Sequence, residues 1–205
     1  MDETRKDKPF TVIIVASPRR EGRVARAARE VEIMGADAGG RGVVFNLMDV
    51  AMYPCCGCMK CRTTGECVYK DAHVRMIADS IKRCDMLVVA APTYWGNMPG
   101  NLKVLFDRLV PVLIKDGAPG HFPKPLHKGK RYAIITACST PWPFNRLLGE
   151  SSAAVAAIKR VFRYSGFKCV DTIQMAGGRD VDTRRCARLV KSLFNNKCCR
   201  QGRIG

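Results

Sequence analysis

Five short apolar runs, separated by amphipathic segments, constrain the fold of this chain most strongly. The runs are FTVIIVAS (10–17), GVVFNL (42–47), DMLVVAAPTY (85–94), RYAIITACS (131–139) and FKCVDTIQMAG (167–177). Each is rich in β-branched residues and almost continuously apolar, as is typical of strands that are covered on both faces. The sequence therefore predicts five buried strands of a parallel sheet.

The segments between these runs predict helices. Apolar residues recur at helical spacing in two of them: Val74, Ile77, Ala78 and Ile81, and then Leu102, Leu105, Phe106 and Leu109. Asp71 is placed to cap the first helix, and Pro111 should end or kink the second. A third helix is expected over residues 151–164.

Strands that alternate with helices form a parallel sheet wrapped by helices on both sides. Five such units predict an α/β, doubly wound, three-layer domain with the flavodoxin-like strand order 2-1-3-4-5. We expect this domain to span residues 10–194, with a cysteine-rich loop (53–71) inserted after the second strand. Residues 1–9 then form a charged N-terminal tail, and residues 195–205 a basic C-terminal tail. Ligands of this architecture bind beyond the C-terminal ends of the strands, which directs attention to the loops there.

Composition narrows the class of protein. The chain has 205 residues, of which 47% are hydrophobic, and this fits one globular domain. No apolar run approaches the roughly 20 residues that span a bilayer, and the start MDETRKDKPF does not resemble a signal sequence, so we expect a cytoplasmic protein without a membrane span. The formal net charge of +17 favours acidic partners such as phosphorylated cofactors or acidic electron carriers. The sequence has no pattern typical of nucleic-acid-binding modules, so nucleic acid is not an expected partner.

The loop after the first predicted strand, ASPRREGRVAR, leads into a helix. A helix N-terminus offers backbone N–H groups and partial positive charge, which suit a phosphate. Ser17, Arg19, Arg20 and Arg23 add a hydroxyl and three cationic side chains. Neither the glycine-rich dinucleotide motif nor the P-loop motif is present. The alternative interpretation is a solvated basic turn.

The loop after the third predicted strand, APTYWGNMPGNLK, could hold a planar heterocycle. Pro92 and Gly96 predict a tight loop, Tyr94 and Trp95 supply flat aromatic faces, and Asn97 is placed to cap the next helix. Backbone amides and aromatic rings together suit the edge and face of such a ligand. The alternative is that these rings only cover the edge of the sheet.

Two other segments carry aromatic and histidine side chains. The loop after the fourth strand, TACSTPWPFNRLLG, carries Trp142 and Phe144, which could wall the same pocket or contact a second subunit. His121 and His127 lie among prolines and lysines in GAPGHFPKPLHKGK, and we expect both to be exposed loop residues.

Five of the eleven cysteines lie in YPCCGCMKCRTTGECVYKD, residues 53–71. In a reducing compartment, clustered thiols indicate metal or redox chemistry before structural disulfides. Cys55, Cys58, Cys61 and Cys67 have the spacing C-x2-C-x2-C-x5-C, which begins like the bacterial ferredoxin motif for a [4Fe–4S] cluster. A four-thiolate zinc site, a dithiol–disulfide couple of Cys55 and Cys58, and a loop without metal remain as alternatives. Outside this loop, thiols in or beside apolar runs are expected to be buried: Cys84, Cys138 and Cys169.

Three segments together resemble a known family. SPRREG, CCGCMKC…GECVYKD and APTYWGNMPGNLKVLFDR, in matching order within residues 10–175, look like the NADPH-dependent FMN reductase-like branch of the flavodoxin-like superfamily, which includes the iron–sulfur flavoproteins. The resemblance implies that Ser17, Arg19 and Gly22 lie at the FMN phosphate. It also places Pro92, Thr93, Tyr94, Trp95, Gly96 and Asn97 at the isoalloxazine ring.

The resemblance also implies a function. It is that of an FMN-dependent NAD(P)H oxidoreductase that passes electrons to a quinone, free flavin, metal or protein acceptor, with no side chain required as acid or base. The alternative is an iron–sulfur flavoprotein that carries electrons between a [4Fe–4S] cluster, FMN and a ferredoxin-like partner. A homodimer or homotetramer is expected in either case. The chain departs from the family where Asn and Ser or Thr often follow the loop glycine: it has Arg23 and Val24, and we expect Arg23 to replace the lost hydroxyl with a charge-assisted bond.

Overall fold

The computed structural model describes residues 8–116 and 121–194, and a parallel sheet runs through its centre. Within these residues the sheet has five strands in the order β2-β1-β3-β6-β7. The strands are β1 (Phe10–Val15), β2 (Arg41–Asn46), β3 (Met86–Pro92), β6 (Arg131–Ala137) and β7 (Lys168–Met175). Counted by the strands of this sheet alone, the order is 2-1-3-4-5, so the predicted fold class and topology are confirmed. Each predicted run extends one or two residues beyond its strand, into the loops at the C-terminal edge.

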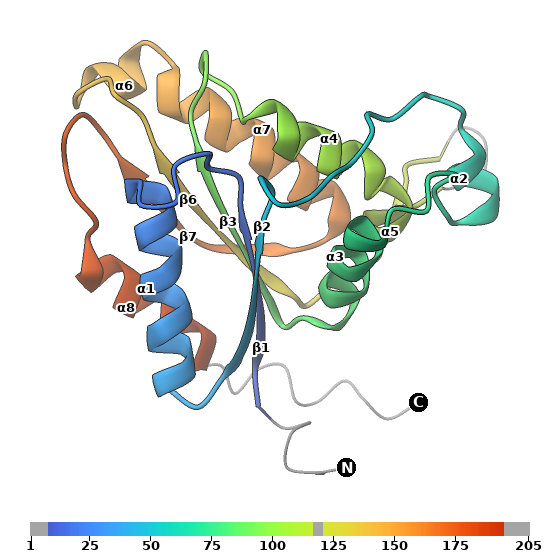
Figure 1. Cartoon of the computed structure of the whole chain (residues 1–205), viewed down its shortest axis with the longest axis horizontal. Helices are drawn as coiled ribbons and strands as arrows, with labels where there is room; N and C mark the ends of the chain where they lie inside the picture. Colours follow the sequence, from blue (N-terminus) through green and yellow to red (C-terminus); the bar gives the residue numbers. More distant parts are fainter. Residues whose placement is uncertain (1–7, 117–120, 195–205) are drawn as a thin grey trace.

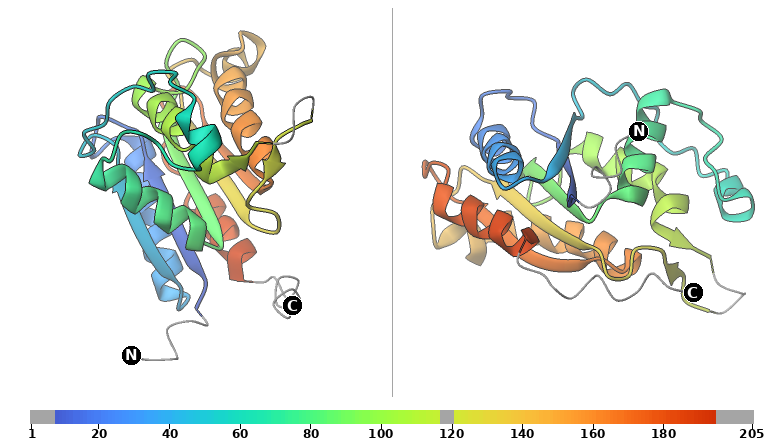
Figure 2. Two further views of the ribbon diagram at one scale, coloured as in Figure 1. Left: turned by 90° about the vertical axis from the view of Figure 1, so that its right-hand side faces the viewer. Right: turned by 90° about the horizontal axis from the view of Figure 1, so that it is seen from below.

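Helices cover both faces of the sheet, giving three layers (Figures 1 and 2). The helices α1 (Arg23–Asp37) and α8 (Thr183–Phe194) pack on one face. The other face carries α3 (Ala72–Arg83), α4 (Gly100–Arg108) and α7 (Glu150–Ser165). Shorter elements are α2 (Lys60–Thr64), α5 (Val110–Leu113), α6 (Phe144–Leu147) and the antiparallel pair β4 (Ile114–Lys115) and β5 (Lys124–Pro125). No helix in the described residues is long and apolar enough to cross a membrane.

The strands bury side chains on both faces because a helix layer lies on each side. In β1, Val12 and Ile14 pack into the core beneath α3, α4 and α7, whereas Ile13 and Val15 pack toward α1 and α8. All four side chains are at most 3% exposed. This two-sided burial explains why the sequence shows continuous apolar runs rather than the alternation of a one-sided sheet.

The predicted helices are present, and the long helix α8 was missed together with the short helices α2, α5 and α6. Asp71 precedes α3, and α4 ends at Arg108, ahead of Pro111, which lies in the first turn of α5. The helix expected over 151–164 is α7. We did not predict α8, because the residues after the fifth predicted strand were included in the domain without an element of their own. Its buried Cys186, Leu189 and Val190 nevertheless have helical spacing.

Two burial predictions were wrong. Cys169 is exposed, because it lies near the start of the edge strand β7, whereas Cys84 and Cys138 are buried as expected. His127 is 3% exposed rather than a surface residue, because its ring lies 4.7 Å from that of Phe167 and its Nε2 lies 2.9 Å from the carbonyl oxygen of Val112.

Candidate functional site

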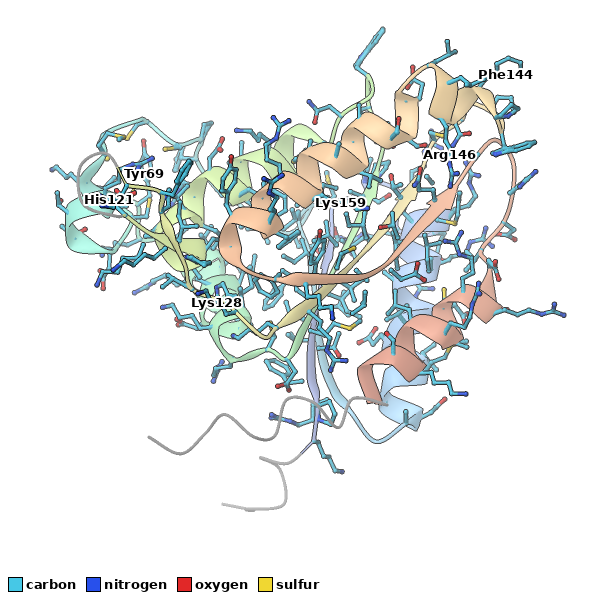
Figure 3. The ribbon with its side chains drawn as sticks, turned by 180° about the vertical axis from the view of Figure 1, so that it is seen from behind. Tyr69, His121, Lys128, Phe144, Arg146 and Lys159 are labelled. Carbon is cyan, nitrogen blue, oxygen red and sulfur yellow. The ribbon has the colours of Figure 1, made fainter. Side chains whose placement is uncertain are left out.

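The loops after β1, β3 and β6 lie together at the C-terminal edge of the sheet, at the top of Figure 1. We call residues 16–22 the phosphate loop, residues 92–97 the flavin loop and residues 53–71 the cysteine loop. Parallel strands deliver these loops to one edge because all their carboxyl ends point the same way. Figure 3 labels Tyr69 of the cysteine loop and Phe144 of α6, and they lie on opposite sides of the molecule in this view.

The phosphate loop is ordered by its own hydrogen bonds. Ser17 is 4% exposed, and its Oγ accepts from the Arg19 N–H at 3.3 Å. The N–H of Gly22, the residue before α1, donates to the Arg19 carbonyl oxygen at 3.0 Å. A Cβ at Gly22 would lie 2.9 Å from the Arg19 Cβ, so this close turn requires glycine. The first N–H groups of α1 have no acceptor within the helix. The phosphate loop places them at the C-terminal edge of the sheet, where they can donate to a bound anion.

The cationic side chains of this loop are partly engaged elsewhere. Arg20 forms an ion pair with Asp49 at 2.5 Å. The Arg23 guanidinium donates to the carbonyl oxygens of Gly177 and, at 2.8 Å, of Arg179, which lie in the loop after β7. Arg23 therefore braces α1 against that loop. The expected bond from its guanidinium to a phosphate would require these contacts to break.

The flavin loop contains a tight turn. The N–H of Tyr94 donates to the Asn97 carbonyl oxygen at 2.9 Å, and the N–H of Asn97 donates back to Tyr94 at 2.9 Å. Trp95 and Gly96 between them have positive φ values of 52° and 67°, the conformation of a type I′ turn. The prediction that Asn97 caps α4 was wrong: Pro99 occupies that position, and the Asn97 Oδ1 accepts from the N–H of Met98 at 2.8 Å.

The turn holds an aromatic ring out into solvent. Trp95 is 100% exposed, although a left-handed backbone is unusual for a large side chain. Below it, the loop is fixed to β6, because the Thr93 N–H donates to the Ala137 carbonyl oxygen at 2.9 Å and its hydroxyl lies 3.1 Å from that of Thr136. A rigid base and a free indole suit a surface that contacts a flat ligand or a second protein surface.

Apolar side chains continue from the flavin loop onto the neighbouring loop and α6. A Cβ at Gly96 would lie 3.7 Å from the Gly149 carbonyl oxygen, so the two segments touch. The exposed apolar side chains on this second segment are Trp142 (59%), Phe144 (55%), Leu147 (74%) and Leu148 (71%). Trp142 and Phe144 thus reach solvent, as a subunit contact would require.

The cysteine loop keeps its thiols reduced and largely accessible. Cys55, Cys56 and Cys58 are exposed, whereas Cys61 and Cys67 are half-buried. Burial raises the pKa of the Cys61 thiol, and nearby Cys67, Cys55 and Cys58 add to this effect. The four predicted ligands therefore lie within electrostatic range of one another.

The donor set fits an iron–sulfur cluster in kind and number, since four thiols share one short loop. In the part of the chain that the structure describes, however, no three His, Cys, Asp or Glu side chains are close enough together to hold a metal ion.

Arg108 is the residue at this site that the sequence analysis missed. It ends α4 and binds the cysteine loop from beneath, with its Nε donating to the Cys67 Sγ at 3.1 Å. Its carboxylate partner is Asp71, which occupies the N-cap position of α3 as predicted but makes no capping bond. An arginine within the apolar segment LFDRLVPVL could have drawn attention to it, because a buried cation requires a partner.

The sequence profile of the NADPH-dependent FMN reductase family matches residues 11–179. The chain belongs to this family. The match confirms the resemblance seen in the sequence.

Individual relatives agree in fold and in part of the sequence. An iron–sulfur flavoprotein of Methanocaldococcus jannaschii is 34% identical over 101 residues, which are 49% of this chain and 52% of that protein. The chain thus spans about half the length of this curated relative. The solved structure of an NAD(P)H:quinone oxidoreductase from Methanothermobacter marburgensis superposes with a TM-score of 0.70 at 16% identity, covering 92% of this chain and 98% of the other. An FMN-dependent NADH-azoreductase from Bacillus anthracis, solved with FMN, gives a TM-score of 0.66 at 15% identity, covering 90% and 95%.

Proposed function

We propose that this protein is an FMN-dependent NAD(P)H oxidoreductase. One observation carries the proposal: the phosphate loop and the flavin loop lie at the same edge of the sheet. The phosphate loop makes a close turn at the N-terminus of α1, and the flavin loop is a rigid turn from which the Trp95 indole projects. Membership of the FMN reductase family supports the same cofactor. Bound FMN would accept hydride from NAD(P)H and pass electrons on singly or in pairs.

The residues have separate binding roles in this proposal. The Ser17 hydroxyl, the N–H groups around Gly22 and the first turn of α1 hold the phosphate, while Arg19 adds an exposed positive charge. The backbone of Pro92–Asn97 meets the ring edge, and Trp95 contacts a ring face. No side chain of the chain is assigned a proton transfer, because hydride chemistry belongs to the cofactor.

The proposal is tested by titrating the purified protein into FMN and following the quenching of flavin fluorescence. The complex should then be bleached by NADPH or NADH, and turnover should appear when a quinone is added. A protein that leaves FMN fluorescence unchanged, in a folded state verified by circular dichroism, would contradict the proposal.

Acceptor and assembly are further parts of the proposal. A quinone, a free flavin or an acidic redox protein suits the net charge of +17, since a positive surface attracts anionic partners. A homodimer or homotetramer is supported by the exposed apolar side chains that surround the flavin loop, which a second copy would cover. Light scattering of W142A and F144A variants, compared with wild type, tests this assembly.

A second candidate is an iron–sulfur flavoprotein that carries electrons between a [4Fe–4S] cluster, FMN and a ferredoxin-like partner. It is favoured by the four spaced thiols of the cysteine loop and by relatives that are named iron–sulfur flavoproteins. Cys55, Cys58, Cys61 and Cys67 would hold the cluster, which would supply one-electron transfer. Reduction by a reduced ferredoxin but not by NADPH, with a steep dependence on salt, would favour this candidate over the first.

A further inference from the structure

Arg108 is a charged residue enclosed within the protein. Its side chain is 0% exposed, and it is among the largest fully buried side chains in the described residues. Removing a guanidinium from water is costly unless charges and hydrogen bonds compensate it. A buried arginine at the end of an amphipathic helix therefore has a structural or chemical task that an apolar residue could not perform.

The oxygen acceptors that Arg108 contacts lie at the two ends of the cysteine loop. One Nη donates to the Tyr53 carbonyl oxygen at 2.8 Å, and the other donates to the Tyr69 carbonyl oxygen at 3.2 Å and to the Asp71 carboxylate. The guanidinium also lies 4.6 Å from the centre of the Tyr69 ring, which stacks on Tyr53 at 5.8 Å. One side chain thus closes the loop at its base.

The remaining donor, Nε, points at a sulfur atom. It lies 3.1 Å from the Cys67 Sγ, while both Nη atoms are held by oxygen acceptors. A planar guanidinium has fixed donor directions, so binding the loop ends also fixes where Nε–H points. Cys67 is therefore held in place by the same residue that closes the loop, whereas Cys55 and Cys58 lie exposed in its middle.

The segment that carries Cys61 has space beside it. A cavity of about 310 Å³ separates α2 from the α5–β4 region and is lined by Cys61, Val110 and Ile114, among others. Across it, Arg62 forms a partly exposed ion pair with Asp116 at 2.6 Å. Such a partly exposed pair stabilises a position only weakly.

We propose that Arg108 is the positioning residue of a metal site in the cysteine loop: it fixes Cys67 as the anchored ligand of the set that Cys55, Cys58 and Cys61 complete. This inference rests on the second candidate function, in which the loop holds an iron–sulfur cluster. The Nε–H···S bond offsets negative charge on a metal-bound thiolate, and such bonds to ligand sulfur raise the reduction potential of a cluster.

The test compares wild type with the variants R108K, R108M and R160M after anaerobic reconstitution with ferrous iron and sulfide. Arg160 is exposed on α7, so R160M removes an equal charge without touching the loop. Iron and sulfide per chain, the visible absorption band and the reduction potential are measured for each. Wild type and R160M should take up about four iron and four sulfide per chain. R108M should take up at least fivefold less.

The conservative variant separates positioning from folding. Lysine keeps the charge but cannot hold both loop ends and the sulfur at once, so R108K should bind iron with a lower reduction potential than wild type. An unchanged potential in R108K, or full iron content in R108M, would overturn the proposal. If R108M does not unfold cooperatively on heating, the R108K potential alone decides.

FMN quenching is recorded on the same samples to keep the two proposals distinct. Wild type that quenches FMN but takes up no iron overturns the role of Arg108 and leaves the reductase proposal intact. Wild type that takes up iron but does not quench FMN refutes FMN binding, and the variants then still decide the role of Arg108.

Discussion

His127 should make the protein less stable in mild acid. The ring is buried, with Nε2–H donating to the Val112 carbonyl oxygen, and its Nδ1 has no hydrogen-bond partner in the described structure. Burial, together with the positive charge of Lys130, lowers the pKa of His127 from 6.5 to about 4. Between pH 6.5 and pH 4, His127 is therefore protonated in the unfolded chain but neutral in the folded protein. The free energy of unfolding consequently rises with pH in that window.

The expected size of the effect follows from the two pKa values. The full gap between the folded and unfolded pKa of His127 corresponds to about 3 kcal/mol, and about 2 kcal/mol of it should be lost between pH 7 and pH 5. Urea unfolding of wild type and His127→Gln at both pH values measures this, because glutamine can keep the bond to Val112 but does not titrate.

Other groups contribute to the pH dependence of both proteins, so the comparison uses the difference between them. The free energy of unfolding of wild type should fall by about 2 kcal/mol more than that of the variant on going from pH 7 to pH 5. Equal losses in the two proteins would mean that His127 is solvated, as the sequence alone led us to expect, and would refute the argument from burial.

Three further predictions concern the phosphate loop, the core and the flavin loop. Gly22→Ala places a Cβ 2.9 Å from that of Arg19, so FMN should bind about tenfold more weakly in a fluorescence titration. The control Gly35→Ala, in open space on α1, should leave FMN affinity unchanged and raise stability by about 0.5–1 kcal/mol; equal affinities for both variants would contradict the close-turn argument. Phe162→Ala removes a fully buried ring and should cost about 3–5 kcal/mol in denaturant unfolding, with a loss below about 1 kcal/mol indicating a looser core. Trp95→Ala should leave the melting temperature unchanged, because the indole is 100% exposed, while weakening FMN binding; unaltered affinity would remove the ring-stacking role.

The fold could be predicted from the sequence because its signals are local and repeated. Five apolar runs and three helical periodicities gave the topology, since strands covered on both faces lack polar alternation. The missed helix α8 has the same periodicity, with Cys186 and Leu189 buried, but the sequence analysis assigned no element to this segment. The short pair β4 and β5 has no comparable pattern, because two residues per strand are too few to show one.

The candidate site could be located but not described. The phosphate and flavin loops were identified because each follows an apolar strand, and parallel strands must bring such loops to one edge. The bond partners of Arg23, which lie more than 150 residues away in the chain, could not be inferred, because a long side chain can reach acceptors on any neighbouring element. The conformation of Trp95 also depends on the turn that contains it.

The sequence by itself thus determined the layers, the strand order and the loops that can carry chemistry. It could do so because buried strands and helix faces show as patterns of apolar residues. Only the tertiary structure decided which polar groups form hydrogen bonds and ion pairs with each other. Arg108 on α4 contacts Asp71 and Cys67, which lie 37 and 41 residues earlier in the chain, and no periodicity relates it to them. His127 was misplaced for the same reason: its burial depends on Phe167 and Val112, and a loop sequence carries no record of the partners that enclose it.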